Sequence, residues 1–399
     1  MKKKKQSKKK IGKANRFLYA IVYRVLKKKY VKKYNITFDN DIVKDIKGPA
    51  IVVATHTCDE DHILSALTLY PIRPTYIVSQ HFKHNPKTAK LLKLMHVIFK
   101  KMFTPDAKTI VKILRAKAEG AVIVIFPEGR LSCYGHSVPV TSGTAELIKK
   151  LGIDLYAWRA DGAYLSFPKW RDAGDSRTGK INASVKLLLS AEEISEKSVS
   201  EIKQITENAI LHDDELAMAG VEFNSDAIAK GVDRILYKCP VCLMEDKISS
   251  EGDKIRCECG LEATLDPCYE LHGAPFKRIN EWFEWQKSTI DTENSSLSSK
   301  ARFGACGPDG FMNPNAGEGE IYIDKNVFTL RGTIHGEKID FSIPTEKIGA
   351  FPILPGDHFD IYIGGNLVYV YPLPDLRAAV KWVSFVDKFN EDRKLSVTL

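Results

Sequence analysis

The sequence predicts an α/β protein with a mostly parallel sheet flanked by helices, followed by a cysteine-rich module and a β-rich region. Short apolar runs such as residues 50–54 (AIVVA) and 121–126 (AVIVIF) alternate with helical patterns in the first part of the chain. Two close cysteine pairs follow at residues 239–259, and β-type runs separated by turn residues occupy residues 320–371. Strands that alternate with helices favour parallel pairing, because parallel strands need a long crossover connection.

The positive charge of the chain is concentrated at its beginning. The formal net charge is +9, yet residues 1–33 contain 15 Lys or Arg and no Asp or Glu, so the remainder is net negative. A helix is predicted for residues 13–34, in which Phe17, Ile21 and Val25 share one face. A lysine-rich segment beside an apolar helix face is typical of attachment to an anionic membrane surface. A helix packed on its own domain explains the same face, and this alternative stays open.

The composition argues against several protein classes. The body of the chain lacks the basic surface that nucleic-acid binding needs, so nucleic acid is not an expected partner. No apolar run reaches the roughly 18 residues of a spanning helix, and no secretory signal follows the N-terminal lysines. Four of the eight cysteines are scattered without disulfide-type spacing. We therefore predict a cytoplasmic protein that lies peripherally on the inner face of the membrane.

The predicted elements divide the chain into five segments. In the α/β part, strands are expected at 50–54, 76–78, 121–126 and 155–158, and helices at 59–70, 87–101, 108–118 and 143–151. The segments are a basic membrane-surface segment at 1–34, an α/β domain at 35–231, a cysteine module at 236–268, a helical and polar connector at 269–315, and a β-rich domain at 316–399. Several strands before one closing helix give the last segment a pleckstrin-homology-like shape, and shape does not imply function.

A histidine and an aspartate follow the first buried strand. His56 comes directly after strand 50–54, and Asp61 lies five residues further on, within HTCDED. Five residues of one helix turn by about 140° beyond a full turn, so the two side chains meet only if His56 lies in the loop and Asp61 in the first helical turn. In such a pair the imidazole takes a proton from an alcohol, and the carboxylate fixes its tautomer. A structural histidine beside a helix-capping acid is the alternative.

The second buried strand runs directly into residues 126–132 (FPEGRLS). Gly129 allows close approach of a backbone, and Arg130 offers a rigid fork of donors for a phosphate. Glu128 is expected to orient Arg130 or a substrate hydroxyl, and Ser132 completes the motif. The alternative is an ordinary strand-end turn with a surface salt bridge.

The two motifs, at 56–61 and 126–132, together resemble the lysophosphatidic acid acyltransferase family of glycerolipid acyltransferases over about residues 35–190. The resemblance implies transfer of a fatty acyl group from acyl-CoA or acyl-acyl carrier protein to the free hydroxyl of a lysophospholipid. It implies 1-acylglycerol-3-phosphate as the acceptor and phosphatidic acid as the product. It also implies that His56 and Asp61 are catalytic, and that the second motif helps to bind the acceptor phosphate.

The chain departs from the family between the two motifs. The family carries there an aromatic residue and then an arginine that helps to hold the acceptor phosphate. In this chain residues 100–106 (KKMFTPD) occupy that place and contain no arginine. Lys101 or Lys108 is predicted to substitute as a point charge. Because the departure concerns the acceptor, a non-catalytic lipid-binding or scaffold protein stays open as the alternative function.

Four cysteines have the spacing of metal ligands. Cys239 and Cys242 form a C-x-x-C pair, and Cys257 and Cys259 follow as a C-x-C pair after fourteen residues. Two such pairs on two turns predict a zinc ribbon. Four thiolates leave no open position for water, so the predicted zinc is structural. A redox pair or unliganded thiols are the alternative.

Overall fold

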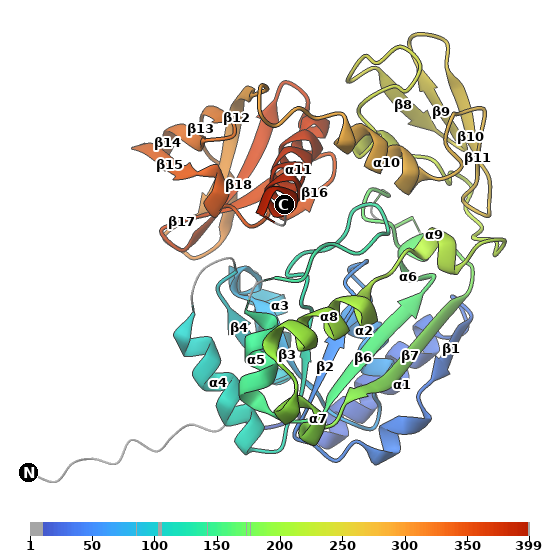
Figure 1. Cartoon of the computed structure of the whole chain (residues 1–399), viewed down its shortest axis with the longest axis vertical. Helices are drawn as coiled ribbons and strands as arrows, with labels where there is room; N and C mark the ends of the chain where they lie inside the picture. Colours follow the sequence, from blue (N-terminus) through green and yellow to red (C-terminus); the bar gives the residue numbers. More distant parts are fainter. Residues whose placement is uncertain are drawn as a thin grey trace, which may run out of the picture.

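Figure 1 shows the chain in a computed structural model that describes residues 11–84, 86–102, 106–141, 143–172, 174–175 and 177–397. The lysine-rich residues 1–10, on which part of the predicted membrane attachment depends, lie outside the described residues. The described residues form two seven-stranded sheets and one four-stranded sheet.

The first sheet has the strand order β1-β7-β6-β2-β5-β3-β4. Its strands are β1 (Ile36–Asp39), β2 (Ala50–Ala54), β3 (Thr75–Ser79), β4 (Ile98–Lys100), β5 (Val122–Ile125), β6 (Leu155–Asp161) and β7 (Ile181–Leu189). All neighbouring strands pair in parallel except β6 and β7. The predicted α/β class with a mostly parallel sheet is therefore confirmed.

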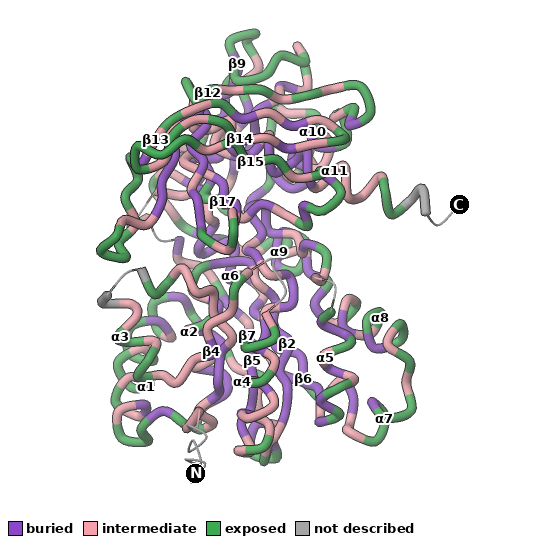
Figure 2. The backbone as a smooth tube through the Cα atoms, turned by 90° about the vertical axis from the view of Figure 1, so that its left-hand side faces the viewer, coloured by how far each residue is buried: buried purple, intermediate pink, exposed green. Residues whose placement is uncertain are grey.

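Helices cover both faces of this sheet. One face is packed by α1 (Arg16–Tyr30) and α2 (Asp61–Thr68), and the other by α4 (Ala107–Ala118), α5 (Thr144–Leu151), α7 (Ala191–Glu196) and α8 (Val199–Ile210). Successive residues of β2 alternate between the two cores: Val52 belongs to the first, and Ile51 and Val53 to the second. Burial on both sides explains why β2 is apolar throughout instead of alternating. In Figure 2 the strands form a buried layer between partly exposed helices.

Helix α1 packs on its domain through tyrosines and leaves an apolar stripe outside. The rings of Tyr23 and Tyr70 stack with their centroids 3.7 Å apart. Phe17, Ile21 and Val25 are 81%, 56% and 60% exposed. The stripe is therefore not the surface by which α1 packs against its own domain. Among the described residues, no helix combines the length and apolar character that crossing a membrane requires.

The prediction of one helix over residues 87–101 is wrong at its C-terminal end. Helix α3 spans Pro86–Leu94, and His96 then takes a positive φ of 55°. The chain turns there and Ile98–Lys100 form β4, which pairs with β3. Ile98 is buried against the sheet, so tertiary packing overrides the helical pattern.

The prediction of a helical and polar connector at 269–315 is also wrong in part. The segment contains α10 (Ile279–Ser288), as expected, but Leu297–Cys306 form strand β12. The polar character of β12 reflects alternation: Ala301 and Phe303 are buried, Arg302 between them is partly exposed, and Ser298 and Lys300 are exposed. Period-two alternation is the pattern of a strand with one covered face.

The remaining elements form two antiparallel sheets. The cysteine module contains β8 (Ile248–Glu251), β9 (Lys254–Cys257), β10 (Glu262–Leu265) and β11 (Leu271–His272). The C-terminal sheet runs β15-β14-β13-β12-β18-β17-β16, with β13 (Met312–Ile323), β14 (Val327–Ile334), β15 (Glu337–Pro344), β16 (Ile353–Leu354), β17 (His358–Ile363) and β18 (Asn366–Leu373). Helix α11 (Ala379–Val397) follows it. The β-rich region with a closing helix is confirmed, and its pleckstrin-homology shape stays a prediction.

One hydrophobic core joins the C-terminal sheet, the cysteine module and loops of the α/β part. It includes Tyr134 and Trp170 from those loops, Ile255 from the module, and Phe359 and Trp382 from the C-terminal region. Figure 1 shows the C-terminal sheet and α11 beyond the carboxyl ends of the parallel strands. In α/β sheets this edge is where ligands usually bind, so the C-terminal region borders the expected site.

Candidate active site

His56 and Asp61 meet in the arrangement that their spacing requires. His56 lies in the loop after β2, and Asp61 is the first residue of α2. The Nδ1 atom of His56 lies 3.2 Å from Oδ2 of Asp61. The histidine side chain is 24% exposed, whereas the aspartate side chain is 1% exposed. The carboxylate thus holds one ring nitrogen, and the imidazole itself remains accessible.

The carboxylate of Asp61 is held in place by hydrogen bonds from the loop that carries His56. Its Oδ2 atom accepts hydrogen bonds from the backbone amides of Thr57 and Cys58 at 2.7 and 3.0 Å. The thiol of Cys58 donates to Oδ1 at 3.2 Å. A buried carboxylate with several donors keeps a fixed orientation, which in turn fixes the imidazole. Burial and the neighbouring carboxylate of Asp61 raise the pKa of Cys58 well above its usual range, which disfavours the thiolate form.

Two further acidic residues of the same loop are paired with cations from a distant part of the chain. Lys169 lies 3.3 Å from Asp59, and Arg171 lies 3.2 Å from Glu60. These pairs fix the loop from the side of residues 167–172. Sequence reasoning missed both, because the partners are more than a hundred residues apart and no local pattern connects them.

Glu128 connects the two motifs through backbone amides. Its Oε1 atom accepts from the amide of His56 at 2.9 Å, and Oε2 accepts from the amide of Val138 at 3.0 Å. The side chain is buried, and burial raises its pKa to about 8 against the opposite effect of the two amides. Its contacts are those of a residue that positions the His56 loop. Glu128 was expected to orient Arg130 or a substrate hydroxyl, and the described contacts include neither.

The second motif also contacts the His56 loop directly. The amide of Ser132 donates to the carbonyl of His56 at 3.0 Å. The ring of Phe126 stacks on the imidazole with centroids 4.2 Å apart. Gly129 has a φ of 72°, a left-handed conformation that closes the turn after Phe126 and that glycine adopts at little cost. Phe126 was quoted as part of the motif, but its packing against the histidine was not predicted.

The side chain of Arg130 is buried and forms an ion pair with the C-terminal helix. Its Nη2 atom lies 2.6 Å from Oδ2 of Asp387 on α11, and Nη1 donates to the carbonyl of Phe351 at 3.4 Å. The arginine side chain is 6% exposed. A phosphate that bound Nη2 of this guanidinium would have to displace Asp387. Binding of the acceptor phosphate by Arg130 stays a prediction, and nothing in the sequence pointed to Asp387.

Lys101 lies at the edge of the sheet, beneath the β17–β18 turn. Its backbone amide donates to Asp106 at 3.1 Å, and its side chain is exposed. The ammonium lies 3.1 Å from the position that a Cβ atom would take at Gly365 in that turn. Lys101 therefore borders the same interface as Arg130. Lys108, the other predicted substitute, is exposed on α4.

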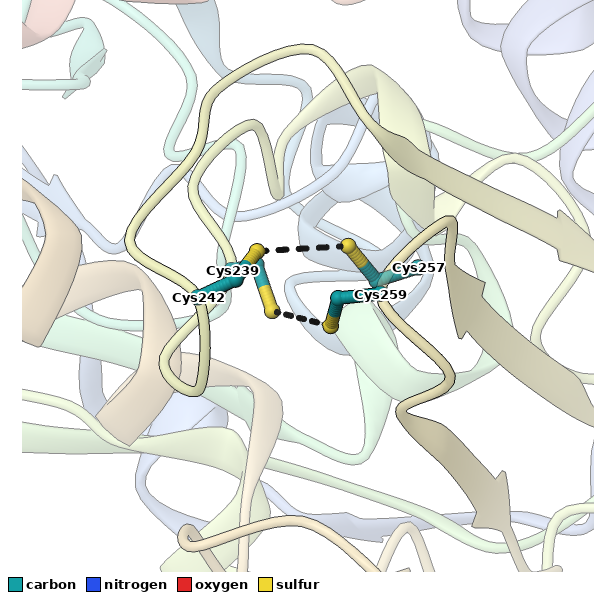
Figure 3. A group of neighbouring side chains, drawn as sticks. All are labelled: Cys239, Cys242, Cys257 and Cys259. Carbon is teal, nitrogen blue, oxygen red and sulfur yellow. Dashed lines mark hydrogen bonds between the residues drawn. The ribbon is translucent and has the colours of Figure 1, made fainter.

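The four cysteines come together as their spacing predicts. Figure 3 shows their sulfur atoms facing one another from two turns. Cys239 and Cys259 have their sulfurs 3.7 Å apart, and Cys242 and Cys257 have theirs 3.8 Å apart. Four thiolates placed about 2.3 Å from a central zinc ion in a tetrahedron lie about 3.8 Å from one another. The donor set and its spacing therefore fit zinc, and all four sulfurs lie within 4.8 Å of one another.

Comparison with known proteins places the two motifs in one family. Residues 24–159 match the family model described as Acyltransferase, and this range includes both motifs. Among solved structures, the chain is similar to the 1-acyl-sn-glycerophosphate acyltransferase PlsC from Thermotoga maritima. The two share 16% sequence identity over 49% of this chain and 77% of that chain, with a TM-score of 0.41. Over residues 24–159, which include both motifs, the chain is thus similar to the acyltransferase family.

Proposed function

We propose that the chain transfers a fatty acyl group from an acyl thioester to the free hydroxyl of a lysophospholipid. The observation that carries the proposal is the contact of His56 with Asp61 at 3.2 Å, with the imidazole accessible and the carboxylate buried. The family match over both motifs supports the reaction class. The donor is acyl-CoA or acyl-acyl carrier protein. The acceptor that the motif resemblance implies is 1-acylglycerol-3-phosphate, which would give phosphatidic acid.

In the proposed reaction His56 acts as the general base. Asp61 accepts a hydrogen bond from the Nδ1–H group of His56, so the lone pair of Nε2 is available to take a proton from the acceptor hydroxyl. The hydroxyl oxygen then attacks the thioester carbonyl, and the imidazolium forms next to the buried carboxylate. As the intermediate collapses, the carbon–sulfur bond breaks, and the imidazolium returns the proton to the leaving thiolate. The products are an ester and a free thiol.

The remaining parts have supporting roles in this proposal. Glu128 positions the His56 amide, and the four cysteines hold a structural zinc that takes no part in the chemistry. The lysine-rich beginning and the exposed stripe of α1 attach the protein to an anionic membrane surface, where the acceptor is concentrated. On this proposal the protein acts peripherally at the inner face of the membrane.

The test is an acyl-transfer assay on the purified full-length protein, with both donor types and a panel of lysophospholipids. Formation of the diacyl product together with stoichiometric free thiol supports the proposal. A protein that binds lysophospholipids but releases no thiol above the buffer rate with either donor would instead be the non-catalytic lipid-binding alternative.

A further inference from the structure

Arg130 and His56 lie in adjacent parts of one site but are presented very differently. The two loops that carry them follow β2 and β5, which are neighbouring parallel strands. Two residues after Arg130, the amide of Ser132 donates to the carbonyl of His56. The imidazole is 24% exposed, whereas the guanidinium is 6% exposed and already paired. A substrate can therefore reach the base without reaching the arginine.

The contact that closes Arg130 is part of a fixed interface. The neighbours of Asp387 on α11, Val383 and Val386, are fully buried in the core that joins the C-terminal sheet to the α/β loops. Further contacts link the same regions: the hydroxyls of Ser79 and Tyr362 lie 3.3 Å apart. Domains move readily relative to one another when their interface is small and polar. A shared hydrophobic core, with an ion pair whose arginine is buried, instead argues against a lid that opens in each turnover.

The net charge of the Arg130–Asp387 pair affects which acceptor head group can bind next to it. A phosphomonoester carries between one and two negative charges at neutral pH and binds best to an unpaired arginine. Here Asp387 supplies the negative charge, so an incoming monoester would meet a neutralised guanidinium and a carboxylate. A phosphodiester head group carries one negative charge at most and is often balanced by its own cation, so it meets much weaker repulsion.

We infer that Asp387 is a specificity-determining residue, whose carboxylate takes the place of an acceptor phosphate at Arg130 and selects lysophospholipids with a phosphodiester head group over phosphomonoesters. The inference rests on the proposed function and narrows its acceptor. It departs from 1-acylglycerol-3-phosphate, the acceptor implied by the motif resemblance, because that molecule carries a terminal phosphomonoester.

The experiment compares two acceptors with the same acyl chain in mixed micelles, 1-acylglycerol-3-phosphate and 1-acylglycerophosphocholine. The proteins are wild type, Asp387→Asn, which keeps the shape, and Asp387→Ala, which also makes room. Asp392→Asn is the matched control, because Asp392 lies on the same helix but pairs with Lys388 and Thr292. If Asp387→Ala does not fold, Asp387→Asn still tests the loss of charge.

Wild type should have the higher kcat/KM with the phosphocholine acceptor. Both Asp387 variants should raise kcat/KM for the phosphomonoester by about tenfold or more, mainly through a lower KM, because a charged hydrogen bond contributes on that scale. The phosphocholine acceptor should show no comparable change, and Asp392→Asn should behave as wild type. Adding Arg130→Gln to the Asp387 variants should abolish the gain. A wild type that prefers the monoester, with no gain in either Asp387 variant, would overturn the inference.

A binding measurement tests the role of Asp387 independently of acyl transfer. Glycerol 3-phosphate is a soluble phosphomonoester, and its affinity can be measured by calorimetry without turnover. It should bind the Asp387 variants about tenfold more tightly than wild type. If no acceptor is acylated by wild type, the proposed function fails. The glycerol 3-phosphate affinities then still decide the role of Asp387, since equal affinities for all variants would contradict it.

Discussion

The two loops at the carboxyl edge of the sheet use the same kinds of side chains in opposite ways. After β2, an acid is buried and a histidine is left accessible: Asp61 holds His56 at 3.2 Å. After β5, the cation is buried, and its acid comes from the C-terminal helix: Asp387 holds Arg130 at 2.6 Å. The first pair is local in sequence and leaves one partner free to react. The second joins residues 257 positions apart and leaves the arginine buried and paired with a carboxylate.

This difference shows that a sequence motif can contain all its expected residues while those residues have different structural roles. The Asp61–His56 pair has a free ring nitrogen, so its geometry is compatible with turnover. The Arg130–Asp387 pair satisfies both charges, so its first effect is to fix the C-terminal region over the site. Breaking such a buried pair by removing one partner typically costs about 3–5 kcal/mol, because a charge is left without a partner.

The largest effect on the first loop is expected from Asp61→Asn. The substitution keeps the shape but replaces a carboxylate oxygen with an amide group that cannot accept from His56, Thr57 and Cys58 together. The histidine then loses its fixed tautomer, and acyl transfer should fall by roughly 10²- to 10⁴-fold. Initial rates of thiol release measure the loss. A folded Asp61→Asn variant with near wild-type rates would remove the carboxylate from the mechanism.

Removal of the metal should disturb the second loop more than the first. The cysteine module shares its core with Tyr134, four residues after Arg130, whereas His56 belongs to no part of that core. Cys242→Ser should lower zinc content from about one equivalent and loosen the module, because thiolate ligation is coupled to folding. Elemental analysis and hydrogen exchange measure both effects. Protection should fall in the module and around residues 130–134. Unchanged protection with zinc lost would contradict this coupling.

The pH dependence of stability should report on Glu128, which bridges the two loops. Its pKa is raised from 4.5 to about 8 in the fold, so the folded protein holds this proton more tightly than the unfolded chain. The resulting stabilisation is fully present below about pH 4.5, declines as pH rises toward 8, and is absent above it. Thermal unfolding of wild type and Glu128→Gln between pH 5 and 9 tests this. Relative to Glu128→Gln, wild type should lose stability up to about pH 8. Parallel curves would show that Glu128 keeps an ordinary pKa.

The smallest effect on chemistry is expected from the exposed stripe of α1, which touches neither loop. Replacing Phe17 and Ile21 with serine should weaken binding to anionic vesicles while leaving transfer in detergent micelles unchanged. Each side chain contributes about 1.5–3 kcal/mol when fully buried in an apolar environment. Vesicle sedimentation measures the change, with Leu211→Ser, which is also exposed, as the control. Equal vesicle binding by all three proteins would mean that α1 is not the membrane contact.

Sequence reasoning predicted the elements whose signals are local in the sequence. The apolar run of β2, the loop position of His56 and the helical position of Asp61 follow from periodicity and from a five-residue spacing. The cysteine cluster follows from its own spacing. Strand β4 was missed because its pairing with β3 and the burial of Ile98 override the helical pattern of residues 87–101.

The contacts missed by sequence reasoning join distant parts of the chain. Lys169 and Arg171 reach the His56 loop from more than a hundred residues away, and Asp387 reaches Arg130 from α11. An aspartate on a helix carries no sign of its partner in the sequence. Only the packing of the C-terminal sheet onto the α/β part brings the two charges together.

The most direct test of the central claim compares His56→Ala with His62→Ala. His62 is the nearest other histidine, and its side chain is exposed on α2, so it serves as the matched control. His56→Ala should lower acyl transfer by roughly 10²- to 10⁴-fold at unchanged folding, while His62→Ala stays near wild type. Because His56 and Asp61 act as a unit, His56→Ala combined with Asp61→Asn should lose no more than His56→Ala alone. Full activity of a folded His56→Ala variant would contradict the account.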